Sequence, residues 1–113
     1  MEGCVFCKIV RGELPSRKEY ENDDVIAFRN IKPAASIHLL IIPKKHIFTF
    51  HEMSQKDGKV FLEMMKAAQR LIQKMKLEEG YKLIINGGEY QFVPHLHWHL
   101  LAGEIPENFA KNL

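Results

Sequence analysis

The pattern of hydrophobic and polar positions predicts strands on both sides of one long helix. The predicted strands are short apolar or alternating runs bounded by turn residues; they cover residues 18–21, 25–30, 37–43, 81–86 and 95–102. Residues 4–10 are expected to form a short helix that ends before Gly12 and Pro15. This order of elements predicts an α+β fold with a mainly antiparallel sheet.

The long helix is the most periodic segment of the chain. Ser54 and Asp57 stand three residues apart at its start, a pair close to a capping box. Apolar residues then recur at helical spacing, namely Val60, Phe61, Met64, Ala68, Leu71, Ile72 and Met75. We therefore expect an amphipathic helix that runs to about Gly80, with its methionines in the core rather than at a cofactor.

Residues 95–102 carry an unusual polar pattern. His95, His97 and His99 alternate with apolar residues, and Pro94 before them suits the first position of a strand. In a strand this spacing places three imidazoles on one face and the apolar residues on the other. Because histidine titrates near neutrality, such a face indicates proton transfer, nucleophilic attack or metal ligation. The pattern alone does not separate catalysis from metal binding.

The composition is that of an ordinary globular protein. Apolar residues make up 46% and charged residues 27% of the 113 positions, which argues against disorder and favours a single domain over residues 1–113. The formal charge of +2 is small and the basic residues are scattered, so no nucleic-acid or membrane-surface partner is expected. We see neither a signal-peptide pattern nor an apolar run of membrane-spanning length. With two cysteines, the protein is expected to be cytoplasmic with reduced thiols.

Three blocks of sequence together resemble the histidine triad (HIT) family, and its Hint-like branch in particular. They read CVFCKIVRGELPS, IAFRNIKPAASIHLLIIPKKHI and VPHLHWHLLAG. The hallmark of that family is His-φ-His-φ-His-φ-φ, with φ apolar, and residues 95–101 satisfy it at every position. The resemblance extends from Cys4 to about Gly103. It implies a single domain with the HIT-like fold, a C-terminal tail over about residues 104–113, and a homodimer with one continuous sheet.

The resemblance also implies an activity. Members of the family cleave a nucleoside monophosphate from a leaving group, in adenosine phosphoramidates, adenylates or dinucleoside polyphosphates. By resemblance, His97 would attack the α-phosphate and become a covalent nucleotidyl-histidine, and His99 would hydrogen-bond the phosphoryl oxygens. His38 would orient the triad from the neighbouring strand, and His95 completes the catalytic set.

A nucleotide-binding set follows from the same resemblance. The expected substrate is a purine nucleotide, an adenosine monophosphate derivative. Its binding residues would be Phe6, Phe28, Asn30, Ile31, Leu40, Asn86, Gln91 and Val93, together with His97 and His99. Phe6, Phe28, Ile31 and Leu40 would form an apolar slot for the base. Plain core packing is the alternative for these four, and it is equally favoured for Leu40.

The pair Cys4-Val-Phe-Cys7 has two interpretations once a redox role is set aside, because the Trp-Cys-Gly-Pro-Cys pattern of thioredoxins is missing. Some HIT proteins hold zinc with such a pair, and the equivalent ligands here are Cys4, Cys7, His46 and His95. A set of four protein ligands leaves no open position, which is typical of structural zinc. The alternative is a pair of reduced, partly buried thiols without a metal. No organic cofactor is expected.

Three positions depart from the family pattern. Phe92 stands where relatives have Ser, Thr or Glu, and in Hint-like enzymes the Ser hydroxyl is thought to help the leaving group depart. Asn30 replaces the acidic residue that holds the ribose hydroxyls, and the loop at residues 87–90 is short. A catalytically weak nucleotide-binding or protein-interaction module is therefore the alternative function. The tail over residues 104–113 is expected either to lie near the other protomer's site or to fray.

Overall fold

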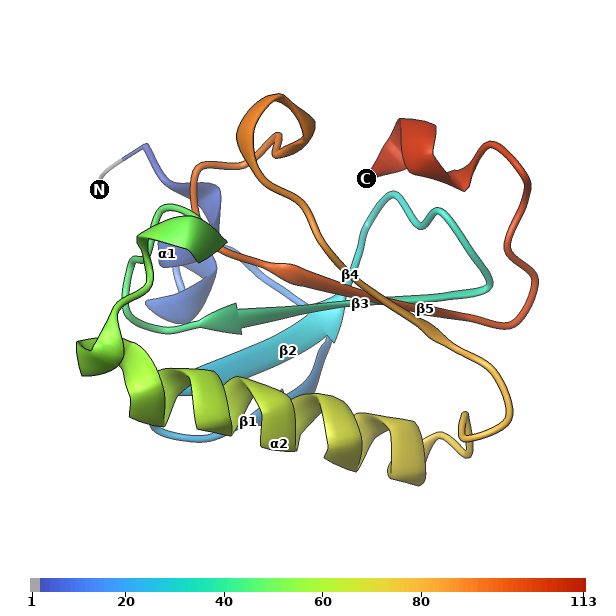
Figure 1. Ribbon diagram of the computed structural model, residues 1–113, viewed down its shortest axis with the longest axis horizontal. Coiled ribbons are helices and arrows are strands. Elements are labelled where there is room, and N and C mark those ends of the chain that lie inside the picture. The colour runs from blue at the N-terminus through green and yellow to red at the C-terminus, as the bar shows by residue number, and fades with distance from the viewer. Residues whose placement is uncertain (1–2) are drawn as a thin grey trace.

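The computed structural model describes residues 3–113 and contains an antiparallel sheet with a helix on each face (Figure 1). The strands are β1 (Lys18–Glu21), β2 (Val25–Arg29), β3 (Ile37–Pro43), β4 (Lys82–Ile85) and β5 (Trp98–Ala102). They lie in the order β1-β2-β3-β5-β4, and each neighbouring pair is antiparallel. The helices are α1 (Val5–Val10) and α2 (Gly58–Lys74), and the 3-10 turns are η1 (Phe50–Glu52), η2 (Gln55–Asp57), η3 (Gly88–Tyr90) and η4 (Phe109–Asn112). The predicted α+β fold is confirmed.

Strands β2 and β3 form the centre of the molecule because their side chains are buried on both faces of the sheet. The residues that pack on the α2 side are Val25, Ala27, Leu39 and Ile41. Those that pack on the α1 side are Ile26, Phe28, Leu40 and Ile42. This alternation follows from the period of two in a strand. Within residues 3–113, neither helix has the length and apolar character needed to cross a membrane.

Helix α2 begins as the sequence predicts but ends earlier. Ser54 and Asp57 form the capping box, and the 3-10 turn η2 leads into the helix. The helix ends at Lys74 rather than near Gly80, because Lys76 adopts a left-handed conformation with φ of 58°. The Leu77 N–H donates to the Ile72 carbonyl at 2.9 Å, five positions earlier in the chain, which is the 6→1 bond of a Schellman motif. Burial of Leu77 accompanies this turn.

The buried face of α2 is displaced from the one that periodicity predicts. Met64 and Leu71 are fully buried as expected, and Ala67, which the pattern missed, is fully buried as well. Phe61 packs its ring against the edge of Trp98, yet 40% of it stays exposed. The inclusion of Phe61 among the residues that α2 buries was therefore wrong.

Strand β5 begins at Trp98 instead of residue 95. Its neighbours β3 and β4 provide partners only as far as Ile41 and Ile85, both opposite Trp98. Residues 95–97 are therefore outside the ladder, and the Leu96 N–H donates instead to the Ile47 carbonyl at 2.7 Å. The predicted separation of faces nevertheless holds. The apolar residues of this segment join the core under α2, whereas the rings of the first two triad histidines contact Phe6 of α1.

The other boundaries lie within one residue of the prediction. Cys4 is the N-cap of α1, and its Sγ accepts the Cys7 N–H at 3.3 Å. Strand β2 ends at Arg29, so Asn30 follows the sheet, and β4 covers the central part of the predicted range 81–86. At the C-terminal end, Leu113 is buried on this chain and joins a small apolar cluster with Ala34 and Leu101.

Candidate active site and metal centre

A cavity of about 460 Å³ lies between α1, the end of β2 and the histidine segment. The predicted residues that line it are Phe6, Phe28, Asn30, Ile31, Leu40, Val93, His97 and His99. Phe6, Phe28 and Leu40 are buried and form its apolar wall, whereas Ile31 at its rim is 92% exposed. An isoleucine exposed to this extent beside an apolar cavity offers surface to a ligand. The cavity therefore has the walls of a site for a flat apolar group with a histidine cluster at one end.

His97 is held by the main chain through one ring nitrogen. Its Nδ1 lies 2.8 Å from the carbonyl oxygen of His95. A carbonyl can only accept, so Nδ1 carries the proton and Nε2 keeps its lone pair in the neutral ring. Burial lowers the pKa of His97 below its ordinary value, although the bond to the His95 carbonyl opposes the shift. The ring is therefore neutral at neutral pH, with Nε2 free to act as a nucleophile.

His38 and His99 form a directed pair beside His97. The Ala34 N–H donates to His38 Nδ1 at 2.9 Å, so the proton of neutral His38 is on Nε2. That Nε2 lies 2.9 Å from His99 Nδ1, which must accept it. The remaining proton of His99 is then on its Nε2, a buried atom with no hydrogen-bond partner among residues 3–113. An orphaned buried donor beside a cavity indicates an acceptor that a ligand would bring.

Burial keeps this pair neutral. It lowers the pKa of His38 to about 4, with a smaller contribution from the nearby His97. It lowers the pKa of His99 to about 3, and the neighbouring His97 and His38 act in the same direction. Above pH of about 5, the pair therefore donates hydrogen bonds without carrying charge.

Two predicted residues do not line the cavity. The Gln91 amide donates to the carbonyls of Phe48 and Val93, and its oxygen accepts from the Thr49 hydroxyl at 2.7 Å. These contacts tie the segment before the triad to the loop after β3. Asn86 follows β4 and is half-buried, away from the cavity lining. A nucleotide-binding role for Gln91 or Asn86 stays a prediction.

Sequence reasoning missed part of the apolar wall. Val5 and Ile9 of α1 also line the cavity, and so does Leu113 at the C-terminal end. Val5 and Ile9 are four residues apart and Phe6 and Ile9 are three apart, which places all three on one side of the helix. That spacing was available in the sequence. The position of Leu113 had no sequence signal, because a short polar tail carries no period.

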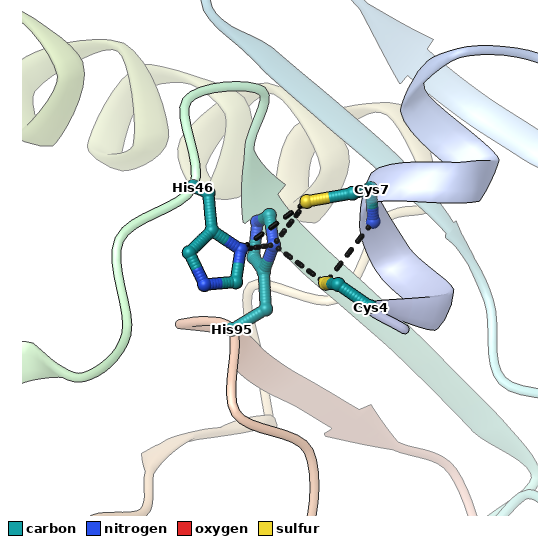
Figure 2. Close-up of side chains that lie close together, drawn as sticks. All are labelled: Cys4, Cys7, His46 and His95. Carbon is teal, nitrogen blue, oxygen red and sulfur yellow. Dashed lines mark hydrogen bonds between the residues drawn. The ribbon is translucent and has the colours of Figure 1, made fainter. Parts of the chain in front are cut away.

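The four predicted metal ligands meet in one cluster (Figure 2). Their ligand atoms all lie within 4.8 Å of one another, and they belong to Cys4, Cys7, His46 and His95. His95 Nδ1 is 3.3 Å from Cys4 Sγ, 3.5 Å from Cys7 Sγ and 3.2 Å from His46 Nδ1. With Zn–S of about 2.3 Å and Zn–N of about 2.0 Å, tetrahedral coordination separates ligand atoms by about 3.3–3.8 Å. The distances from His95 are therefore compatible with a metal site formed by these four residues.

The tautomer of His95 suits a metal ligand. Its Nε2 lies 2.8 Å from the Pro43 carbonyl and must donate, which leaves the lone pair of Nδ1 directed into the cluster. Without a cation, burial and the neighbouring Cys4 raise the pKa of Cys7 to about 11. A bound divalent cation would reverse this preference and stabilise the thiolate. Because both ring nitrogens of His95 are engaged, its assignment to the catalytic set stays a prediction.

A second cavity of about 310 Å³ adjoins the first and was not foreseen from the sequence. Its lining includes Arg17 and Arg29, along with Asn30, Ile31 and His38. The two arginines are adjacent because the Arg29 N–H donates to the Arg17 carbonyl across the β1–β2 pair. The hairpin was predicted, but the register that aligns them was not. The cavity places basic groups next to the histidine pair.

Comparison with known proteins agrees with this arrangement. Residues 11–105 match the model of the HIT domain. The chain is 39% identical over 105 residues to the purine nucleoside phosphoramidase of Escherichia coli strain K12, covering 90% of this chain and 88% of that enzyme. It is 36% identical over 103 residues to the bifunctional adenosine 5′-phosphosulfate phosphorylase/adenylylsulfatase of Arabidopsis thaliana, covering 89% and 70%.

Solved structures give the same answer. A HIT family hydrolase from Clostridium thermocellum superposes with a TM-score of 0.87 at 45% identity, over 91% of this chain and 92% of that one. The histidine face, the order of the strands and the sequence blocks that flank the cavity therefore have one common explanation, which is that this chain belongs to the HIT family.

Proposed function

We propose that this chain is a nucleotidyl hydrolase or transferase that cleaves adenosine 5′-monophosphate, or a close purine analogue, from a leaving group. The observation that carries the proposal is the state of His97, a neutral buried histidine whose Nδ1–H is bound to the His95 carbonyl. His97 lines the end of an apolar cavity, where its Nε2 would face a bound substrate. The relatives named as a purine nucleoside phosphoramidase and an adenylylsulfatase support the substrate class.

In the proposed reaction, the lone pair of His97 Nε2 attacks the α-phosphorus. A P–N bond forms, the bond to the leaving group breaks, and the leaving group departs with the electron pair and takes a proton from solvent. The imidazole then carries a positive charge, which the His95 carbonyl stabilises through Nδ1–H. Water next attacks the phosphorus and gives a proton to solvent. The P–N bond breaks with its electron pair returning to Nε2, which releases the nucleoside monophosphate and restores the neutral ring. An alcohol or phosphate in place of water would make the reaction a transfer.

His99 supplies the electrostatic part of the proposal. Its unpartnered Nε2–H would donate to a non-bridging phosphoryl oxygen, where negative charge is held during the displacement. His38 acts as a positioning residue, because its Nε2–H fixes the tautomer of His99. Phe6, Phe28 and Leu40 would enclose the base, with the exposed Ile31 closing over it.

The experiment that tests the function combines turnover with detection of the intermediate. Wild-type protein is incubated with a fluorogenic adenosine phosphoramidate, and the acid-quenched protein is examined by mass spectrometry for a nucleotidyl adduct. We expect the adduct on His97, and we expect His97→Ala to lose about 10³-fold or more in kcat/KM. His51→Ala is the matched control, because His51 is exposed in η1 and lines neither cavity. Activity of His97→Ala within tenfold of wild type would contradict the assignment, as would an adduct on another residue.

We further propose that the metal in the Cys4, Cys7, His46 and His95 cluster is zinc, in a structural role. The support is the donor set, since Zn²⁺ prefers thiolate and imidazole ligands, whereas Mg²⁺ and Ca²⁺ prefer oxygen ligands. When bound, the metal would link α1 to the loop after β3 and to the segment that enters β5. All four ligands come from the protein, so no position remains for substrate.

A homodimer through β4 is also proposed. Strand β4 is at the edge of the sheet and pairs only with β5 among residues 3–113. Its Leu83 and Ile85 side chains are 40% and 38% exposed, an apolar surface that an edge strand in water does not favour. A second copy paired antiparallel to β4 would satisfy the free backbone groups and cover these residues.

A further inference from the structure

The second cavity continues from the point where the ribose of a bound nucleotide would lie. It shares Arg29, Asn30 and Ile31 with the larger apolar cavity. A nucleotide with its base against the wall formed by Phe6 and Phe28 and its α-phosphate at His97 would therefore have its ribose near Asn30. Any group attached to a ribose hydroxyl on that side would enter the second cavity, toward Arg17.

The second cavity is positively charged. Arg29 Nε donates to Glu19 at 2.8 Å, and Lys74 Nζ lies 3.7 Å from the same carboxylate. The hydrogen bond from Arg29 holds the pKa of Glu19 below its ordinary value against the effect of burial, and the charges of Lys74 and Arg17 act in the same direction. Three cations thus surround one carboxylate. Of the residues described, none with a carboxylate lines the second cavity, whereas both arginines do.

Asn30 presents the wrong polarity for a ribose diol and the right one for an anion. Its Oδ1 already accepts the Lys32 N–H at 2.9 Å. Its Nδ2 lies 3.4 Å from His38 Nε2, which carries the proton given to His99. Two donors do not satisfy each other, so the amide N–H groups of Asn30 are left to a ligand acceptor. In dinucleotide-binding folds, an acidic residue accepts from the hydroxyl of an unmodified ribose, whereas a nearby arginine accommodates a 2′-phosphate.

We propose that the nucleotide substrate carries a phosphate on its 2′ or 3′ ribose hydroxyl, bound in the second cavity by Arg17 and the Asn30 amide, while Arg29 stays paired with Glu19. This inference rests on the proposed function, which sets the position of the nucleotide. The ribose phosphate is a recognition group and takes no part in the displacement at the α-phosphorus. It would raise affinity through charge-assisted hydrogen bonds to the guanidinium group of Arg17.

Calorimetric titration tests the proposal with adenosine 5′-monophosphate, adenosine 2′,5′-bisphosphate and adenosine 3′,5′-bisphosphate as probes. We expect one bisphosphate to bind more tightly than the monophosphate, on the order of 10- to 100-fold, as one or two hydrogen bonds between charged groups provide. The bisphosphate that binds more tightly identifies the hydroxyl that carries the phosphate. Hydrolysis of adenosine phosphoramidate with and without that phosphate should give the same order in kcat/KM.

Variants separate specific recognition from general attraction of anions. Arg17→Gln should reduce the bisphosphate-to-monophosphate affinity ratio toward one, and Asn30→Asp should bring it to one or below. Lys18→Gln is the matched control, because it removes a neighbouring charge that pairs with Glu21 and does not line the cavity. Its ratio should equal that of wild type.

The outcomes distinguish this inference from the function beneath it. Binding of the monophosphate with a bisphosphate ratio of one or less, or an equal loss of ratio in Lys18→Gln and Arg17→Gln, overturns the ribose-phosphate site and leaves the nucleotidyl chemistry standing. Tight binding of a bisphosphate without any turnover supports the site and rejects the hydrolase. Failure of all three nucleotides to bind overturns both.

Discussion

Replacing Phe92 with serine isolates the contribution of leaving-group assistance. Phe92 lines the apolar cavity with His97, yet 69% of it is exposed. A phenylalanine has an accessible surface of roughly 200 Å², so about 60 Å² is buried here, and at about 25 cal/mol per Å² its loss costs about 1.5 kcal/mol. The variant should therefore stay folded, with a modest reduction in the free energy of unfolding.

The chemical effect should be larger and selective. A phenyl ring cannot donate a proton or a hydrogen bond to the departing group, whereas a serine hydroxyl at the same position can. Proton donation of this kind is worth about 10²–10⁴ in rate, and it matters most for leaving groups that depart poorly. Phe92→Ser should thus accelerate a phosphoramidate with an alkylamine leaving group by about 10²-fold or more. It should change the rate for an acyl adenylate little.

The assay compares kcat/KM for one amine and one acyl leaving group in wild type, Phe92→Ser and Phe92→Ala. The alanine variant removes the ring without adding a hydroxyl, so it measures the effect of space alone. Equal changes for the two substrates would refute the reasoning. So would equal gains in the serine and alanine variants, since the hydroxyl would then have no role.

Three further predictions concern the metal, the histidine pair and the dimer. Elemental analysis should find about one zinc per chain in wild type and none in Cys4→Ser. Chelation should lower Tm without unfolding the protein, because a domain with its own core does not need the roughly 10 kcal/mol that zinc supplies to zinc-dependent domains. In the folded protein the pKa values of His38 and His99 are about 4 and 3, below the ordinary 6.5. Between about pH 4 and about pH 6.5 the unfolded chain therefore binds more protons, and the free energy of unfolding should fall as pH decreases from about 6.5 to about 4. A urea midpoint that does not change over this range would contradict the buried neutral pair. Sedimentation should show a dimer for wild type and a monomer for Ile85→Asp, whereas Lys82→Asp, on the opposite face of the edge strand, should remain dimeric; a monomeric wild type removes the proposal.

The sequence predicts the elements well because most of them carry a local signal. The run 37–43 is strongly apolar apart from His38 and ends at a proline, and β3 has these bounds. The end of α2 had no such signal, because a left-handed residue is usually glycine and here it is Lys76. Burial of Leu77 offsets the cost of that conformation, and burial is a property of the tertiary structure. Strand β5 starts late for the same reason: although β3 extends to Pro43, the Leu96 N–H donates to the Ile47 carbonyl and not to the ladder.

In the candidate site, too, features with a local sequence signal were predicted and features set by tertiary contacts were not. Its histidines and cysteines are brought together as expected, because each belongs to a motif with its own spacing. The basic cavity was missed because Arg17 and Arg29 are twelve positions apart and meet only through the register of β1 and β2. Gln91 was expected at the nucleotide, but hydrogen bonds to Val93 and to Phe48 and Thr49 of the loop after β3 occupy its amide. Pairing between distant segments determines both of these positions, and a single sequence does not contain it.

The hydrogen bond between His97 and the carbonyl of His95 has a consequence for how activity depends on pH and on substitution. Many catalytic histidines are oriented by a carboxylate, which titrates and which one substitution removes. A peptide carbonyl does neither, and every amino acid at position 95 would provide it. The tautomer of the proposed nucleophile is therefore a property of the backbone path, and it persists wherever the fold persists. Loss of activity in acid should then report protonation of the histidines of the site, with no contribution from an orienting carboxylate.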